Sequence, residues 1–510
     1  MAIAQKKDIV PEILFITGDA AHAKRVLRMA SEGALRKVYS GIYTSNLASP
    51  LDSVVLRNWQ AIVGHLLPGG VVSFRSAVAA RPEKGKLYIT RGKTRRTITL
   101  PGLVVQVIPG PGPLIQGPAP DAPFKDLYLA SESRWLLENL VAAKGVAERV
   151  MSREELEAQL DKRLVLRGEP GLNRLREICR ELSIVLGLQK EFVRLDKIIG
   201  ALLGTRGQRQ LRSRQALARA AGKPYDPGRL ELFDTLFSHL KADVMPQVRD
   251  RAATGPALEN FAFYEAYFSN FIEGTTFQVQ EAEQIIFEGK MIPSRSEDAH
   301  DVLGTFQAAS QAPWHNAPAR SEDGFLTWLK SVNALVMKSR PDKNPGEWKD
   351  EINQAGNTLF VDPSLVPGTL REGFARILAL EDPFARALMT MFVISEVHPF
   401  QDGNDRTARL AMNAELTAEG LSRIIIPTVY REDYLLPLKA LSNNRDPAPY
   451  LVAMSKIQKW TAAFDYGQPR SAITEALKAC NAFEEDLRRF QLIFPEVPAS
   501  YLQAQRHSTL

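Results

Sequence analysis

The segment from Phe384 to Leu416 constrains the fold of this chain most, because it predicts two helices joined by a tight polar loop. Apolar residues recur at helical spacing up to His398. Pro399 disfavours continuation of the helix, since proline has no backbone N–H and biases the preceding residue away from helical dihedral angles. Residues 402–405 form a turn cluster of Asp, Gly and Asn, and helical spacing resumes from Arg406. A helix that starts after such a loop offers free N–H groups to an anion.

Four side chains indicate which reaction this loop could catalyse. Arg406 and Arg409 are three residues apart and are expected to share a face in the first helical turn, where the helix dipole disfavours cations. That placement indicates an anion between them. His398 can accept a proton near neutral pH, and Asp402 can hold a hard cation. Together they indicate phosphoryl or nucleotidyl transfer; the alternative is a polar interhelical turn with surface arginines.

Residues 398–409, His-Pro-Phe-Gln-Asp-Gly-Asn-Asp-Arg-Thr-Ala-Arg, closely resemble the signature of Fic proteins, His-x-Phe-x-Asp/Glu-Gly-Asn-Gly-Arg-x-x-Arg. Members of that family typically transfer AMP from ATP to a protein hydroxyl. The resemblance implies ATP and Mg²⁺ as substrate and cofactor, and a Ser, Thr or Tyr hydroxyl of a target protein as acceptor. The implied site residues are His398 as the catalytic base, Asp402 as the Mg²⁺ ligand, Gly403, Asn404, Asp405, Arg406 and Arg409 as phosphate-binding groups (with the Asn404 side chain helping), and Phe400 as a core residue that fixes the loop.

Asp405 is the departure from the signature, because the family usually has glycine there. The preferred interpretation is that its side chain caps the second helix and leaves its N–H available. Alternatively it repels phosphate and changes the group that is transferred, since Fic relatives of the Doc type vary here and move phosphate. Removal of AMP, with Glu273 positioning water, is a further alternative within the same site.

Glu273 stands where a helix disfavours it. An aromatic helical stripe from Leu258 to Ile272 ends at Gly274, so Glu273 lies in the last turn, where the dipole repels a carboxylate. Pairing Glu273 with Arg409 would relieve both placements and block the anion site. Residues 269–274 resemble the Ser/Thr-x-x-x-Glu-Gly/Asn inhibitory motif of Fic proteins, which implies an inhibitory role for Ser269 and Glu273. The alternative is an ordinary glutamate at a helix end.

A chain of 510 residues is too long for one ordinary core, so two to four domains are expected. The predicted fold is mainly α: an all-helical Fic core with a small β-hairpin flap, preceded by an α+β module. The flap is expected at residues 357–361, as an edge that aligns a target segment; a plain surface hairpin is the alternative. The predicted segments are an N-terminal module over 1–108, a Pro-rich linker or surface strap over 109–125, a helical middle over 126–250, the Fic core over 257–463 with its inhibitory helix at 257–274, and a helical tail over 464–510.

The N-terminal module resembles AbiEi-type antitoxins with a winged helix. Residues 21–48 predict a basic helix, a glycine turn and a strand, and residues 86–90, 97–100 and 103–108 predict three further strands. The resemblance implies DNA as a partner, with phosphate contacts from cationic side chains. The alternative is a protein-interaction or regulatory module with solvated cations. The candidate contacts are Lys24, Arg25, Arg28, Arg36 and Lys37.

A second basic run lies between Arg206 and Lys223 and contains no acidic residue. It is a candidate for an anionic partner, although a solvated basic loop is the preferred interpretation. These two segments motivate a different class of function, a DNA-binding regulator that uses the Fic core as a nucleotide sensor.

Composition fits a folded soluble protein, with 45% hydrophobic and 24% charged residues. The two cysteines, Cys179 and Cys480, provide no disulfide framework and are expected to be buried thiols. The sequence shows no signal peptide and no apolar run that could span a membrane, so no membrane association and a cytoplasmic location are expected. The sequence leaves open whether the chain forms a homo-oligomer.

Overall fold

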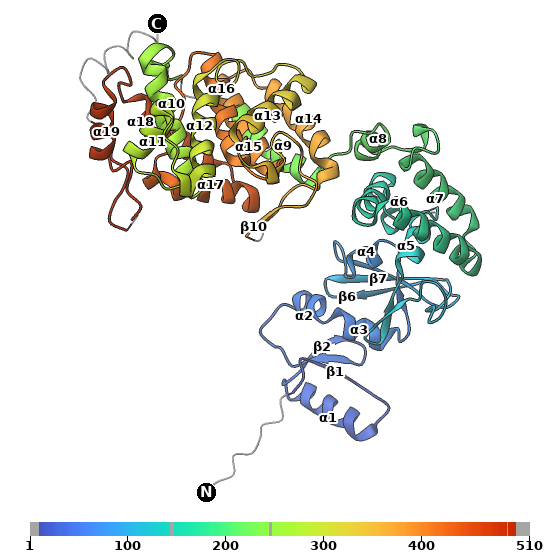
Figure 1. The fold of residues 1–510 in the computed structure, drawn as a ribbon. Coiled ribbons are helices and arrows are strands. Elements are labelled where there is room, and N and C mark those ends of the chain that lie inside the picture. Colours follow the sequence, from blue (N-terminus) through green and yellow to red (C-terminus); the bar gives the residue numbers. More distant parts are fainter. Residues whose placement is uncertain (1–9, 143–146, 244–246, 357, 487, 496–510) are drawn as a thin grey trace. The chain divides into compact units, whose positions relative to one another are not determined.

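The computed structural model describes residues 10–142, 147–243, 247–356, 358–486 and 488–495. The chain forms two compact units, residues 1–221 and 222–510 (Figure 1). The division falls inside the segment 126–250, which the sequence predicted as one helical region. The prediction of a mainly helical protein with an α+β N-terminal part is confirmed.

The first unit begins with a small three-stranded sheet of order β1–β3–β2 beside one helix. Its elements are β1 (Ile13–Phe15), α1 (Ala20–Ser31), β2 (Arg36–Tyr39) and β3 (Ile42–Thr44). A helix-turn-helix needs two helices, whereas the described residues before β2 contain only α1. The winged-helix interpretation is therefore not confirmed. Lys24, Arg25 and Arg28 are exposed on α1, but Arg36 donates to the carbonyls of Asn46 and Ser49 and so holds a loop.

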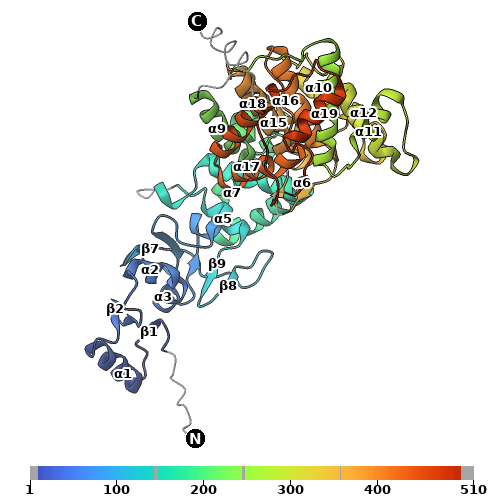
Figure 2. The same cartoon turned by 90° about the vertical axis from the view of Figure 1, so that its left-hand side faces the viewer.

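A six-stranded sheet of order β6–β7–β5–β4–β9–β8 follows, and Figure 2 shows the β8–β9 hairpin at its edge. The three strands predicted over residues 86–108 are confirmed. Leu87 and Ile89 of β5 face the apolar cluster around α2 and α3, whereas Tyr88 packs with Phe74 on the other face. The elements are α2 (Leu51–Arg57), α3 (Trp59–Leu66), β4 (Val71–Val72), α4 (Arg75–Ala79), β5 (Lys86–Thr90), β6 (Arg96–Leu100), β7 (Leu103–Ile108), β8 (Ala122–Phe124) and β9 (Leu127–Leu129).

The Pro-rich stretch is a strap bound to this unit. The buried guanidinium of Arg134 donates to the carbonyls of Pro111 and Gly112 at 2.8 and 2.9 Å. It also pairs with Asp121 at 2.6 Å and with Glu138 at 2.8 Å. Strand β9 shows that the prediction of a helical middle over 126–250 is wrong at its start, because pairing with β4 and β8 sets the local conformation.

Four helices complete the first unit: α5 (Glu132–Glu138), α6 (Arg153–Leu186), α7 (Gln189–Leu202) and α8 (Arg214–Ala220). A capping box begins α6, since Ser152 and Glu155 exchange hydrogen bonds. Two cations of the basic run are structural: Arg206 pairs with Asp196, and Arg219 pairs with Asp161.

The second unit is a helical assembly around the antiparallel pair α15 and α16, with α10, α12, α13 and α14 packed nearby (Figure 1). The predicted flap is a two-stranded hairpin, β10 (Gln354–Ala355) and β11 (Thr358–Leu359). No helix among the described residues is long and apolar enough to cross a membrane. The helices are α9 (Pro227–Ala242), α10 (Gly255–Ile272), α11 (Val279–Glu288), α12 (Ser296–Ser310), α13 (Glu322–Val336), α14 (Val366–Leu378), α15 (Pro383–Val397), α16 (Asn404–Ala418), α17 (Arg431–Asn444), α18 (Ala448–Ala462) and α19 (Arg470–Ala479).

Candidate functional site

The loop between α15 and α16 is shaped by two residues with left-handed backbones. His398 ends α15 with φ of 52°, and Gly403 precedes α16 with φ of 73°. A Cβ on Gly403 would lie 2.7 Å from Sδ of Met337. The position therefore requires glycine both for its dihedral angles and for space.

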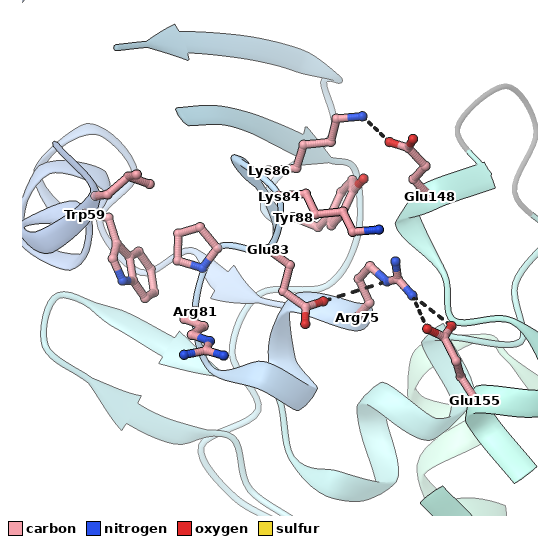
Figure 3. A pocket seen from close by; sticks show the side chains of 11 residues that line it. Trp59, Arg75, Arg81, Glu83, Lys84, Lys86, Tyr88, Glu148 and Glu155 are labelled. Carbon is pink, nitrogen blue, oxygen red and sulfur yellow. Dashed lines mark hydrogen bonds and ion pairs between the residues drawn. The ribbon is translucent and has the colours of Figure 1, made fainter. Parts of the chain in front are cut away.

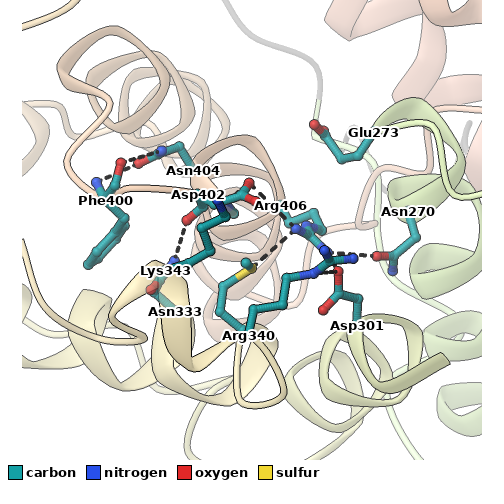
Figure 4. A network of polar contacts seen from close by, with 12 residues as sticks. Asn270, Glu273, Asp301, Asn333, Arg340, Lys343, Phe400, Asp402, Asn404 and Arg406 are labelled. Carbon is teal, nitrogen blue, oxygen red and sulfur yellow. Dashed lines mark hydrogen bonds and ion pairs between the residues drawn. The ribbon is translucent and has the colours of Figure 1, made fainter. Parts of the chain in front are cut away.

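Side-chain amides hold this loop in place, as Figure 4 shows. Oδ1 of Asn404 accepts the N–H of Phe400 at 2.8 Å, and its Nδ2 donates to the carbonyl of Phe400 at 2.9 Å. Nδ2 of Asn333 donates to the carbonyl of Asp402 at 3.0 Å. Both ends of the Asn404 amide brace the loop, and its help in binding phosphate stays a prediction. Sequence analysis missed Asn333, which lies 69 residues before Asp402.

Phe400 is buried, as the sequence predicted, with 1% of its surface exposed. Its ring stacks on Trp348 with centroids 5.1 Å apart. This contact anchors the loop on the segment before the flap.

His398 is placed to act as a base. Its ring stacks on Phe360 with centroids 3.9 Å apart, and its Nδ1 lies 3.4 Å from the carbonyl oxygen of Ser395. Burial lowers the pKa of His398 below its usual 6.5; the carboxylate of Asp405 opposes this shift, and the charge of Lys349 adds to it. A histidine with a lowered pKa is neutral at pH 7 and can accept a proton.

Lys349 is a residue of the site that sequence analysis missed. It is 3% exposed, and its Nζ donates to Oδ1 of Asn353 at 2.6 Å. Burial, followed by the charge of Arg229, lowers its pKa to about 8. Nothing in its local sequence marks it, since its proximity to His398 arises only in the fold.

Arg409 pairs with Glu273, so the predicted contact is present. Nη2 of Arg409 lies 2.6 Å from Oε1 of Glu273. The hydroxyl of Ser269 accepts Nε of Arg409 at 3.0 Å, and the carbonyl of Ser269 accepts Nη2 at 3.0 Å. The guanidinium is 4% exposed, and its Nη1 has no partner in the described structure.

Arg406 is held by a carboxylate that sequence analysis also missed. Its Nη1 lies 2.7 Å from Oδ2 of Asp301 and 3.1 Å from Oδ1 of Asn270 (Figure 4). The same Asp301 oxygen accepts Nε of Arg340 at 2.9 Å. Asp301 is 1% exposed and is shared by two arginines, while Nε of Arg406 has no partner among the described residues.

Helix α16 begins at Asn404, two residues earlier than the sequence indicated. Arg409 consequently lies in the second turn instead of the first. The prediction that Asp405 caps the helix is wrong: Gly403 occupies the cap position, and Asp405 lies in the first turn. There the helix dipole still stabilises its carboxylate. The charge of this carboxylate acts on both His398 and Arg409.

Asp402 is suited to bind a Mg²⁺ ion whose other ligands come from substrate phosphates. Its side chain is 43% exposed, and its Oδ1 accepts the N–H of Gly403 at 2.6 Å. The described residues contain no group of three or more His, Cys, Asp or Glu that could hold a metal. One accessible carboxylate is a suitable donor set for Mg²⁺, which usually binds through one or two carboxylates together with substrate phosphates.

Comparison with known proteins points to the same loop. A model of the Fic/DOC family matches residues 325–416. Protein adenylyltransferase Fic of Drosophila melanogaster is 27% identical over 239 residues, which are 44% of this chain and 46% of the relative. Protein adenylyltransferase fic-1 of Caenorhabditis elegans is 25% identical over 200 residues, 38% of this chain and 39% of the relative. The chain thus spans less than half the length of these curated relatives.

Two solved structures show lower similarity. Fic-1 from C. elegans is 19% identical, with 68% of this chain and 97% of that chain covered and a TM-score of 0.34. A structure of IbpAFic2 in complex with adenylylated Cdc42 is 14% identical, with 63% and 94% covered and a TM-score of 0.31. TM-scores this low carry no inference. The motif at residues 398–409 lies inside the stretch that the Fic/DOC family model matches, so residues 325–416 are similar to a Fic domain.

Proposed function

We propose that this chain is a protein adenylyltransferase that moves AMP from ATP to a hydroxyl group of a protein side chain. The carrying observation is that one loop joins a neutral base, His398, to two buried arginines, each of which has a guanidinium nitrogen without a partner among the described residues. The Fic/DOC family model matches residues 325–416, which include this loop, and curated relatives named protein adenylyltransferase are similar to 38–44% of this chain.

In the proposed reaction His398 takes the proton of the target hydroxyl, and the hydroxyl oxygen attacks the α-phosphorus of ATP. The bond from the α-phosphorus to the bridging oxygen breaks, so pyrophosphate leaves and AMP stays on the target oxygen. A pKa below the ordinary histidine value keeps the base unprotonated at neutral pH. The β10–β11 hairpin ends next to Phe360, which stacks on His398, so a target segment paired with the hairpin would bring its hydroxyl to the base.

The start of α16 would receive the phosphates. Backbone N–H groups of Asn404 and Asp405 would face phosphate oxygens, that of Gly403 would join them once Asp402 releases it, and Arg406 and Arg409 would add charge. Asp402 would hold Mg²⁺, which supplies charge neutralisation at the phosphates when bound. The unpartnered nitrogens of the two arginines support this assignment, because a buried guanidinium N–H without an acceptor is costly.

We infer that Glu273 keeps this enzyme inactive. Its carboxylate already satisfies Arg409, and Ser269 takes two further donors of the same guanidinium. A γ-phosphate would have to compete with this carboxylate. A charge-assisted hydrogen bond contributes about 1.5–3 kcal/mol, so its removal should strengthen ATP binding about 10- to 100-fold.

Because Asp405 departs from the family signature, transfer of phosphate and removal of AMP are alternatives to adenylylation. Its carboxylate lies in the first turn of α16, near the proposed phosphate site. Transfer of phosphate and removal of AMP would both use the same loop, and the label of the nucleotide distinguishes them.

The test is a transfer assay with ATP labelled separately at the α- and γ-phosphates, in which Glu273→Gly protein is incubated with cell extract. We expect α-label on protein, and its loss in the Glu273→Gly, His398→Ala double variant. Label from the γ-phosphate alone would identify a phosphotransferase. Release of AMP from adenylylated protein, without incorporation, would identify the reverse activity. If Glu273→Gly changed neither activity nor ATP affinity, the inhibitory role of Glu273 would be wrong.

A further inference from the structure

Two of the pockets in the first unit differ in how their charged side chains are paired. One, of about 660 Å³, is shown in Figure 3 and is lined by Trp59, Tyr88 and several charged residues. Its central cations are paired: Arg75 lies 2.8 Å from Glu155, and Lys86 pairs with Glu148. Each of these two cations therefore has a carboxylate partner within the chain.

The second pocket, of about 450 Å³, combines an apolar lining with two arginines. It lies where β5 and β7 end, next to the end of α5 and the junction of α6 and α7. The polar lining side chains are those of Arg95, Arg149, Thr90 and Glu138. The apolar lining side chains include Phe74, Ile108, Val141, Leu186 and Leu188.

Arg149 is a buried cation in this pocket without an ion-pair partner in the described part of the chain. It is 7% exposed, and its guanidinium carbon lies 4.7 Å from the centroid of the Phe74 ring. Its Nε has no hydrogen-bond partner, and its Nη2 reaches only the carbonyl of Ala142 at a long 3.4 Å. The neighbouring segment 143–146 reads Ala-Lys-Gly-Val and contains no acidic residue.

A second buried polar group faces the same space. Thr90 is 3% exposed, and its hydroxyl has no partner in the described structure. The carboxylate of Glu138 does not serve either residue, because Oε1 accepts Nε of Arg134 at 2.8 Å and Oε2 accepts the N–H of Phe74 at 3.1 Å. Two orphaned donors therefore converge on one cavity.

The charges around the cavity also favour an anion. Burial and, after it, the positive charge of Arg95 lower the pKa of Arg149, while Tyr88 and Glu138 oppose the shift. The two arginines thus repel each other, and the carboxylate that lines this pocket, Glu138, is engaged by Arg134 and by the N–H of Phe74. A buried charge normally has a partner, because leaving it unpaired costs several kcal/mol.

We propose that this pocket binds a small organic anion, with a carboxylate or phosphate group held by Arg149, Arg95 and Thr90 and an apolar body against Phe74, Ile108 and Val141. The site belongs to the first unit and is separate from the nucleotide site of the Fic domain. It would make the first unit a receptor for a small ligand, whatever the Fic domain transfers.

Isothermal titration calorimetry on the 510-residue chain tests this site, with benzoate, phenyl phosphate and neutral benzyl alcohol as probes. We expect at least one of the two anions to bind and benzyl alcohol to bind more weakly. The comparison of benzoate with phenyl phosphate shows which anionic group the pocket takes. Arg149→Met should weaken the bound anion about tenfold or more, and Thr90→Val by about two- to tenfold.

Arg75→Met is the matched control, since Arg75 belongs to the ion-paired pocket, and it should leave anion affinity unchanged. Binding that survives in Arg149→Met would belong to the Fic site and would overturn the assignment, as would no anion binding or equal binding of benzyl alcohol. If Arg149→Met fails to fold, Arg149→Lys and Thr90→Val decide: weakened binding in both supports the site, and unchanged affinity in both overturns it.

Discussion

Arg409 in the second unit and Arg149 in the first are both buried arginines with one unpartnered nitrogen, yet they differ in what neutralises them. Arg409 is 4% exposed and has Glu273 at 2.6 Å. Arg149 is 7% exposed and has an aromatic ring and a distant carbonyl, but no carboxylate among the described residues. One anion site is occupied by the chain itself, and the other is left to a ligand.

The presence or absence of a carboxylate partner shows how a chain can regulate an anion-binding site. An internal carboxylate stabilises the arginine and must be displaced before an external anion can bind. An arginine without such a partner remains ready for a ligand but contributes little to stability. Mutations should therefore affect activity in the second unit and ligand affinity in the first.

The largest expected effect is on the rate of transfer, which should depend on His398 and not on Arg149. In the Glu273→Gly background, His398→Ala should lower the rate of transfer about 10²- to 10⁴-fold, because it removes the general base. Arg149→Met in the same background should leave the rate without added ligand unchanged. Incorporation of α-labelled phosphate measures both, and equal losses in the two variants would contradict the separation.

Stability should distinguish paired from unpaired buried arginines within the first unit. Arg134 has no exposed side-chain surface and pairs with Asp121 and Glu138. Arg134→Met should destabilise this unit by about 3–5 kcal/mol, since two buried carboxylates lose their partner. Arg149→Met should cost about 1 kcal/mol or less, because only a cation–π contact and one long hydrogen bond are lost. Urea denaturation of both variants tests this, and similar costs would show that Arg149 has a structural partner.

The charge of Glu273 can be tested without changing its size. Glu273→Gln should strengthen ATP binding about tenfold, because a neutral hydrogen bond replaces a charge-assisted one. Glu259→Gln is the matched control, since Glu259 is an exposed residue of the same helix. Calorimetric titration with ATP measures the difference, and equal affinities for the two variants would argue against competition by the carboxylate.

The smallest effect concerns pH. The pKa of His398 lies below 6.5, chiefly because of burial. The active base is the neutral form, so the rate of Glu273→Gly protein should rise with pH, reach half its maximum below pH 6.5, and be constant near pH 7. A pH–rate profile measures this, and an acid limb centred above 6.5 would contradict the burial of the base.

Much of the site could be predicted because its signals are local. Helical spacing, Pro399 and the turn cluster predicted the helix–loop–helix segment, and the paired positions of Glu273 and Arg409 predicted their contact. The start of α16 was predicted two residues late, because the Asn404 amide is used on the Phe400 backbone and Gly403 takes the cap position. The assignment of Asp405 as a helix cap failed for the same reason.

Other features depend on residues far apart in the chain. Asp301 meets Arg406 across 105 residues, and Lys349 comes near His398 across 49. Strand β9 formed where helical spacing had been expected, because its partners β4 and β8 supply its hydrogen bonds. A periodic pattern reports which face of an element is apolar, but it carries no information about which distant side chain will face it.

The sequence by itself determined the Fic loop, its surrounding helices and the carboxylate that opposes Arg409, because these rest on local backbone preferences and on a motif with fixed spacing. Only the tertiary structure decided which charges are neutralised. Asp301 reaches Arg406, Asp121 and Glu138 reach Arg134, and no carboxylate of the described residues reaches Arg149. Charge pairing acts over a few ångströms in space, and that distance is set by packing and not by position along the chain.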